Sequence, residues 1–141
     1  GTTTDEVNQA VDALIAEKVD AIFTPTDNTI QKAELSFYEK LQKAKIPHYG
    51  GADSFALNGA FAGYGVDYVQ LGKATADMVD EVLRGGKETA TLPVQTFDNG
   101  IATVNTDTAE KLGFSMDELK EVFKPYCTKV EEIKTNQEFA K

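Results

Sequence analysis

The order of apolar patterns along the chain constrains the fold more than any other feature of the sequence. Segments with helical periodicity alternate with short apolar runs, and only short polar connections separate them. This order is typical of strands joined by right-handed helical crossovers, which form a parallel sheet with helices on both faces. The sequence therefore predicts an α/β fold. Helices are expected from near Asp5, over residues 30–44 and from Asp67 to about Leu83, and strands over residues 19–24, 46–49 and 60–66.

The second half of the chain adds a predicted hairpin and a helical end. Asp98-Asn99-Gly100 stands between two apolar runs, Leu92 to Phe97 and Ile101 to Val104, and Asn-Gly between two strands is a strong hairpin signal. A helix that ends at Pro125 follows. We interpret residues 128–141 as a weakly amphipathic helix or a mobile tail.

Charge and composition exclude several classes of function. The chain carries 23 acidic and 14 basic side chains, a formal net charge of −9, so nucleic acid and anionic membranes are poor partners. Its single cysteine, Cys127, and single histidine, His48, cannot form an internal disulfide, a cysteine-based zinc cage or a site that needs two histidines. We interpret both as structural residues. Because EF-hand, phosphate-loop and dinucleotide-binding motifs are also absent, we expect no metal and no cofactor.

The loop after the first expected strand is the strongest candidate for a binding site. Thr26, Asp27, Asn28 and Thr29 stand there, directly before a predicted helix. In open α/β sheets, ligands bind at the carboxyl ends of strands, beside the N-termini of helices. A carboxylate with neutral polar neighbours suits a cationic ammonium group. Asp27 or Asn28 could also cap the following helix, and the two roles are compatible.

A second candidate loop follows the next expected strand. Asp53 offers a further polar contact, with Ser54 beside it, and the ring of Phe55 could stack on a ligand or close one side of the site. Tyr64 is the other aromatic candidate on this side. The alternative is a simple turn in which Asp53 caps a short helix over residues 54–58.

Two other functions stay open from the residues alone. The chain could be a small α/β enzyme that uses Asp27 or Asp53 as a general base. No partnered nucleophile, phosphate loop or metal motif accompanies either residue, and we assign no catalytic residue. The chain could also be an interaction domain without a ligand.

A series of motifs between residues 3 and 114 stands in the order and spacing of one known family. The motifs are Val19–Thr29, Ile46–Gly50, Asn58–Ala60, Gly65–Tyr68, Leu71–Lys73, Leu83–Lys87, Leu92–Val94 and Val104–Gly113. Together they resemble the substrate-binding proteins of an ABC importer family that takes up amino acids, including tryptophan- and tyrosine-type ligands.

The resemblance implies the fold of type I periplasmic binding proteins, in which two α/β lobes close on a ligand between them. Residues 1–114 would be a segment of the C-terminal lobe, with residues 67–86 as a crossover helix. The resemblance does not extend beyond residue 114; the residues themselves predict a helical C-terminal extension over residues 115–141. The loops around Asp27 and Asp53 would line the cleft, with Asp27 as the partner of the ligand's α-ammonium group. The N-terminal lobe has no counterpart in this sequence.

The resemblance also implies partners and a location. The protein would bind a solute rather than catalyse a reaction, its ligand would be an amino acid and its partner an ABC permease. It would lie outside the cytoplasm, in the periplasm or lipid-anchored at the outer face of the membrane. We expect the helical face with Leu71, Ala74, Met78 and Val82 to be buried. Because the other lobe would not cover that face here, we expect a homodimer or a swapped oligomer.

Overall fold

The computed structural model describes residues 2–96 and 100–136. In this part of the chain, β1, β2 and β3 run parallel, β4 is antiparallel to β3, and β5 is parallel to β4. The predicted α/β class is confirmed, with a mostly parallel sheet. The strands are β1 (Ile22–Thr24), β2 (His48–Gly50), β3 (Ala62–Gly65), β4 (Gly100–Asn105) and β5 (Cys127–Ile133), and they lie in that order across the sheet.

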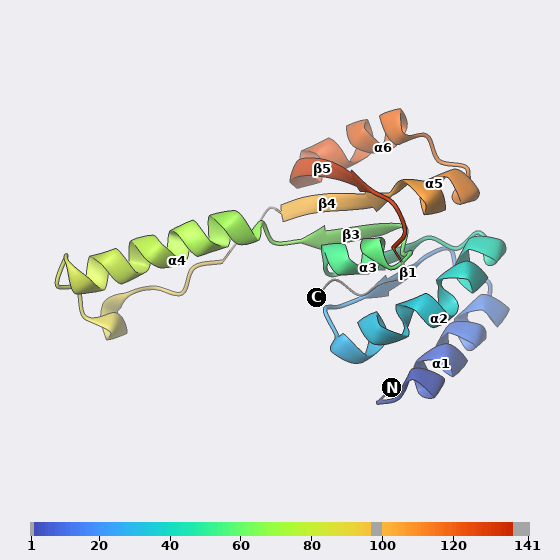
Figure 1. The fold of residues 1–141 in the computed structure, drawn as a ribbon, viewed down its shortest axis with the longest axis horizontal. Helices are drawn as coiled ribbons and strands as arrows, with labels where there is room; N and C mark the ends of the chain where they lie inside the picture. The colour runs from blue at the N-terminus through green and yellow to red at the C-terminus, as the bar shows by residue number, and fades with distance from the viewer. Residues whose placement is uncertain (1, 97–99, 137–141) are drawn as a thin grey trace.

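Helices cover both faces of the sheet (Figure 1). On one face, Ile22 packs into a core cluster with α1 and α2, while α3 lies against β2 and β3. On the other face, Ala62 and Val104 pack with α5 and α6. The helices are α1 (Thr4–Ala16), α2 (Asn28–Ala44), α3 (Asp53–Leu57), α4 (Tyr68–Leu83), α5 (Thr106–Leu112) and α6 (Met116–Phe123), with 3₁₀ turns η1 (Thr89–Thr91) and η2 (Lys124–Tyr126).

Side-chain caps determine where the helices that follow β1 and β3 begin. Asp27 accepts hydrogen bonds from the first backbone amides of α2, and Asp67 does the same for α4. Both carboxylates therefore satisfy amide groups that have no partner within their helix. The predicted start of α4 at Asp67 is confirmed, and of the two candidate caps for α2 the structure uses Asp27 rather than Asn28.

The helix α4 projects away from the sheet as an arm (Figure 1). Its length matches the prediction, but the expected burial of one face is wrong, because none of its residues is buried. Leu71, Ala74, Met78 and Val82 are only half-buried. Their partial cover includes the returning segment 89–94, which lines an apolar groove together with Met78 and Val82.

The predicted hairpin is wrong where the structure describes it. Residues 92–96 form no strand, and residues 97–99 lie outside the described part of the chain. The strand β4 takes β3 as its antiparallel partner instead, with Gly65 opposite Ile101. Residues 101–104 therefore pair with β3, which is distant in sequence, rather than with residues 92–96.

The predicted helical extension over residues 115–141 is wrong at residues 127–133. These residues form β5, which pairs with the outer edge of β4 and places Val130 opposite Ala102. Only α6 and η2 in this segment are helical, and residues 137–141 lie outside the described part. Pairing with β4 satisfies backbone groups that a solvated tail would leave to water. It also places Val130 against the second core cluster.

Candidate functional site

Three loops meet at one edge of the sheet. The strands β1, β2 and β3 are parallel neighbours, so their carboxyl ends, at Thr24, Gly50 and Gly65, lie along the same edge. Each strand leads through a short loop into the N-terminus of a helix, namely α2, α3 or α4. This arrangement is the usual position of a ligand in an open α/β sheet. The two candidate loops predicted from the sequence are the first two of the three.

One oxygen of the Asp27 carboxylate is hydrogen-bonded to the helix, and the other is available to a ligand. Its Oδ1 atom accepts hydrogen bonds of 2.9 Å from the amides of Thr29 and Ile30. Within residues 2–96 and 100–136, its Oδ2 atom takes part in no hydrogen bond. Thr26, Asp27 and Asn28 are exposed. Capping and ligand binding are therefore compatible here, because one oxygen serves the helix and the other faces solvent.

Hydrogen bonds tie the first candidate loop to the second. The Thr26 hydroxyl donates to the carbonyl of Gly51 at 2.9 Å, and the Gly51 amide donates to the carbonyl of Thr24 at 2.9 Å. A Cβ atom at position 51 would lie only 2.8 Å from the Thr26 backbone nitrogen. The glycine is therefore needed for the close approach of the two loops.

The second loop differs in part from the expectation. Asp53 is exposed and is the first residue of α3, while Ala52 occupies the capping position, so the predicted cap by Asp53 is wrong. The Asp53 Oδ1 atom accepts a bond from the Ser54 amide at 2.8 Å. Phe55 is fully buried, with its ring 5.9 Å from the His48 ring. Its place is in the core beneath the loop, out of reach of a ligand in this conformation.

A buried polar chain lies directly beneath the two loops. The Nδ1 atom of His48 is 2.9 Å from Oε1 of Glu34, and its Nε2 atom is 2.8 Å from the hydroxyl of Thr24. Glu34 and His48 are 0% and 2% exposed. Burial raises the pKa of the Glu34 carboxyl, while the hydrogen bond to His48 opposes that rise. The structural interpretation of His48 is thus supported by its burial.

Sequence reasoning missed Glu34 in this chain. Its position does carry a signal, because it stands four residues after Ile30 and three before Phe37, on the face of α2 that is otherwise apolar. A charged residue at such a position needs a buried partner. The only histidine of the sequence follows in the next strand, so the sequence itself indicates His48 as the partner of Glu34.

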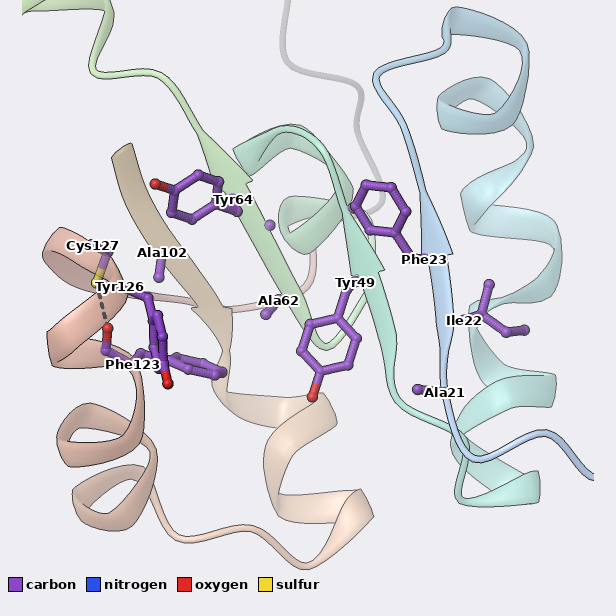
Figure 2. Close-up of a pocket in the computed structure, with 12 residues that line it drawn as sticks. Ala21, Ile22, Phe23, Tyr49, Ala62, Tyr64, Ala102, Phe123, Tyr126 and Cys127 are labelled. Atoms are coloured by element: carbon purple, nitrogen blue, oxygen red, sulfur yellow. Dashed lines mark hydrogen bonds between the residues drawn. The ribbon is translucent and has the colours of Figure 1, made fainter. Parts of the chain in front are cut away.

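The opposite face of the sheet carries an apolar hollow of about 450 Å³. Figure 2 shows Phe23, Tyr49 and Tyr64 on this side of the strands, across from Phe123 and Tyr126. Phe23 is 71% exposed, which is unusual for a phenylalanine on a sheet. The hollow can cover apolar surface of another molecule or polypeptide segment. Its lining contains none of the predicted polar residues of the candidate loops.

The described ranges, residues 2–96 and 100–136, contain neither a metal-binding cluster nor a membrane-spanning helix. Within them, no group of three or more histidine, cysteine, aspartate or glutamate residues could hold a metal ion. Within the same ranges, no helix is both long enough and apolar enough to cross a membrane. Cys127 is buried, and its Sγ atom lies 3.2 Å from the carbonyl oxygen of Phe123.

A sheet with polar loops at its carboxyl edge is typical of a binding lobe. Comparison with known proteins shows the family to which the chain belongs. Residues 2–124 match the family model of ABC transporter substrate-binding proteins. The chain belongs to that family. Among curated proteins, it is similar to the tyrosine-binding protein of Clostridioides difficile (strain R20291), with 34% identity over 111 residues. That match covers 79% of this chain and 32% of the relative.

Solved structures agree with this assignment. A substrate-binding protein with adhesive properties from Clostridium difficile, in its ligand-free open form, matches with a TM-score of 0.76 and 28% identity over 96% of this chain. The ABC domain from Streptococcus pneumonia in complex with L-Trp matches with a TM-score of 0.67 and 31% identity over 91%. A conserved domain protein from Vibrio cholerae matches with a TM-score of 0.67 and 33% identity over 93%. The chain spans about a third of the curated relative and 42–43% of the solved chains.

Proposed function

We propose that the chain forms one wall of an amino-acid-binding cleft in the solute-binding component of an ABC importer. The observation that carries this proposal is the meeting of the Asp27 and Asp53 loops at the carboxyl edge of the sheet. Two relatives whose names specify a ligand, tyrosine for one and L-Trp for the other, support an amino acid as the class of ligand.

Asp27 is the proposed partner of the ligand's α-ammonium group. A carboxylate whose Oδ1 atom is held by two backbone amides has a fixed orientation, so its Oδ2 atom is already placed to accept a charge-assisted hydrogen bond. Hydroxyl and amide groups of the same loop are proposed to complete the polar contacts. The proposed contact residues are Thr26, Asp27, Asn28, Thr29, Asp53 and Ser54; Phe55 is assigned to the core beneath them.

Binding rather than catalysis is the proposed role of these groups. Asp27 and Asp53 are both exposed, and each already binds a backbone amide through one carboxylate oxygen. A general base would need a partnered group, and the hydrogen bonds of Asp27 and Asp53 among the described residues are to backbone amides. Family membership points the same way, because the named relatives are binding proteins.

The rest of the proposed mechanism follows from the share of the relatives that this chain represents. A second lobe would supply the opposite wall of the cleft, and ligand bound between the lobes would favour a closed form that an ABC permease recognises. Such a component works outside the cytoplasm, in the periplasm or lipid-anchored at the outer face of the membrane.

The arm is the proposed contact surface between copies of this chain. Val79 and Leu83 of α4 are 50% and 78% exposed, and the helix has no buried residue. Apolar surface of this kind favours association by about 25 cal/mol per Å² that is removed from water. We propose that two copies cover each other's arms, as a homodimer or by exchange of the arm.

Calorimetry tests the ligand proposal. A panel of L-amino acids that includes tyrosine and tryptophan is titrated into this chain and into a hybrid that joins it to the remaining part of the tyrosine-binding relative. The hybrid is expected to bind at least one aromatic amino acid. Asp27→Asn should weaken that binding by about tenfold or more, because a charged hydrogen bond contributes about 1.5–3 kcal/mol.

Asp12→Asn is the matched control for this titration. It removes the same charge from α1, where Asp12 pairs with Lys40 on the surface. Binding should be unchanged in that variant. A hybrid that binds no amino acid of the panel, or that binds equally well with Asp27→Asn, would contradict the proposal.

A further inference from the structure

We propose that Glu34, His48 and Thr24 are positioning residues of the candidate site, which fix the end of β1 and thereby the loop that carries Asp27. The proposal concerns the buried chain of hydrogen bonds beneath the loops. It rests on the proposed function only for what the loop binds; the positioning itself can be tested without a ligand.

The series of hydrogen bonds begins in the core and ends at the loop. Glu34 of α2 holds Nδ1 of His48, and His48 of β2 holds the hydroxyl of Thr24, the last residue of β1. The rings of Phe37 and Phe55 lie 5.8 Å and 5.9 Å from the imidazole. The Glu34 carboxylate holds one nitrogen of the His48 imidazole, and two phenylalanine rings pack against it. The orientation of the imidazole is therefore fixed, so that its other nitrogen points to the Thr24 hydroxyl.

Thr24 transmits this restraint to both candidate loops. Its carbonyl accepts a hydrogen bond from the Gly51 amide, and the carbonyl of Gly51 accepts one from the Thr26 hydroxyl. Asp27 follows directly and caps α2, the same helix that carries Glu34. The hydrogen bonds thus run from α2 through two strands and back to the start of α2, so the Asp27 carboxylate has a defined place relative to the sheet.

Stability alone does not explain the buried hydrogen bonds between Glu34, His48 and Thr24. A carboxylate that is 0% exposed loses its hydration, and the Oε2 atom of Glu34 has no hydrogen-bond partner within the described residues. Well-packed apolar side chains of similar size are often more stable than a buried ionisable pair. What an apolar replacement could not supply is directional hydrogen bonding to Thr24, which is the property that a site loop requires.

Nuclear magnetic resonance on the whole chain tests the positioning role. Because His48 is the only histidine, every imidazole ¹⁵N signal belongs to it. Exchange of the Gly51, Thr29 and Ile30 amides, which are hydrogen-bonded in the loops, reports on the loops themselves. Amides in the middle of α1 report on global opening.

The variants separate the hydroxyl from the packing of residue 24. Thr24→Val removes the hydroxyl at nearly constant volume, and Thr24→Ser restores it. Thr103→Val is the matched control, because Thr103 is a buried threonine of the same sheet and its hydroxyl has no hydrogen-bond partner within the described residues. Glu34→Gln keeps the size of the side chain but changes its hydrogen bonding to His48.

Thr24→Val and Glu34→Gln are expected to speed exchange of the three loop amides by about fivefold or more beyond any change in α1, which reports the change in global stability, and to shift the His48 signals. Thr24→Ser should behave as the parent chain, and Thr103→Val should leave the loop amides unchanged. Equal acceleration in α1 and the loops, or unchanged loop exchange in Thr24→Val, would overturn the positioning role. So would hydrolysis of p-nitrophenyl acetate that Thr24→Val abolishes, because it would assign a nucleophilic role instead.

This experiment fails separately from the proposed function. If the hybrid binds no amino acid but the loop amides respond as expected, the positioning role stands and the ligand assignment falls. If the hybrid binds an amino acid and the loop amides do not respond, the ligand assignment stands and the positioning role falls.

Discussion

The hydroxyl of Thr26 donates a hydrogen bond to the backbone carbonyl of Gly51, 2.9 Å away, and thereby joins two loops that lie 25 residues apart in the sequence. The contact is possible because residue 51 has no side chain: a Cβ atom there would lie 2.8 Å from the Thr26 nitrogen and 2.9 Å from its hydroxyl oxygen. Separate loops of the same sheet edge thus form one surface.

Gly51→Ala is therefore expected to push the two loops apart. The clash is with backbone, which cannot rotate away, so the free energy of unfolding should fall by about 1–3 kcal/mol. Urea denaturation measures the change. Gly72→Ala is the matched control: apart from its chain neighbours and the backbone of its own helix, no atom lies within 4 Å of the added Cβ, and alanine inside α4 should leave stability unchanged or raise it by up to about 1 kcal/mol. Equal stabilities for the two variants would contradict the close contact.

Two substitutions separate the capping of α2 by Asp27 from the charge of its carboxylate. Asp27→Ala removes the cap of α2 and should lower the free energy of unfolding by about 1 kcal/mol, whereas Asp27→Asn keeps a capping oxygen and should cost much less. Asp67→Ala, which removes the equivalent cap of α4, should show whether the arm contributes to the same unfolding transition. If Asp27→Asn is as destabilising as Asp27→Ala, the geometry of the cap is not what holds this loop.

Stability should depend on pH through Glu34. Burial raises the pKa of this carboxyl in the folded chain above the reference value of 4.5, so the folded state holds the proton more tightly than the unfolded state does. This contribution to stability is complete below pH 4.5 and is lost as the pH rises through the raised pKa. Glu34→Gln removes it, because glutamine does not titrate.

The measurement is the difference in free energy of unfolding between the parent chain and Glu34→Gln, followed by urea denaturation from pH 4 to pH 8. The advantage of the parent chain should be largest at the acidic end and should decrease above pH 4.5. A difference that grows with pH would mean that the bond to His48, rather than burial, dominates the pKa of Glu34.

Local signals in the sequence predicted much of the site. Asp27 and Asp67 were identifiable because a cap followed by helical periodicity is encoded within a few residues, and the loop positions follow from the alternation of helices and strands. Burial of Phe55 was not predictable in this way. A five-residue helix has too little periodicity to show which of its faces meets the sheet, and the answer depends on His48 in another strand.

The strand β5 was missed for a related reason. Lys129, Glu131 and Glu132 give Cys127–Ile133 a polar character, and only Val130 and Ile133 suggest an apolar side. An edge strand needs little burial of its own, because hydrogen bonds to its neighbour specify it. That neighbour, β4, is 22 or more residues distant along the chain, so no local pattern could reveal the pairing.

Self-association through the arm can be tested by a single charge. Val79→Glu places a carboxylate on the exposed part of α4 and should raise the dissociation constant between copies by about tenfold or more. Val122→Glu introduces the same group on α6, where Val122 is 60% exposed, and should leave association unchanged. Sedimentation velocity over a range of concentrations distinguishes the two. A parent chain that stays monomeric at all concentrations would remove the basis for the proposed dimer.

The antiparallel pairing of β3 with β4 has a consequence for the modularity of the chain. Gly65 lies opposite Ile101, so the polypeptide leaves the sheet for α4 and returns to it at adjacent positions. The segment between β3 and β4, which includes α4, is thus an insertion within a β-hairpin. Replacing residues 67–99 with a short glycine-containing turn should give a smaller protein whose sheet and Asp27 loop remain folded. Retained far-ultraviolet circular dichroism of the sheet and a cooperative unfolding transition would show that the edge proposed to bind the ligand can be separated from the arm and produced as an autonomous module.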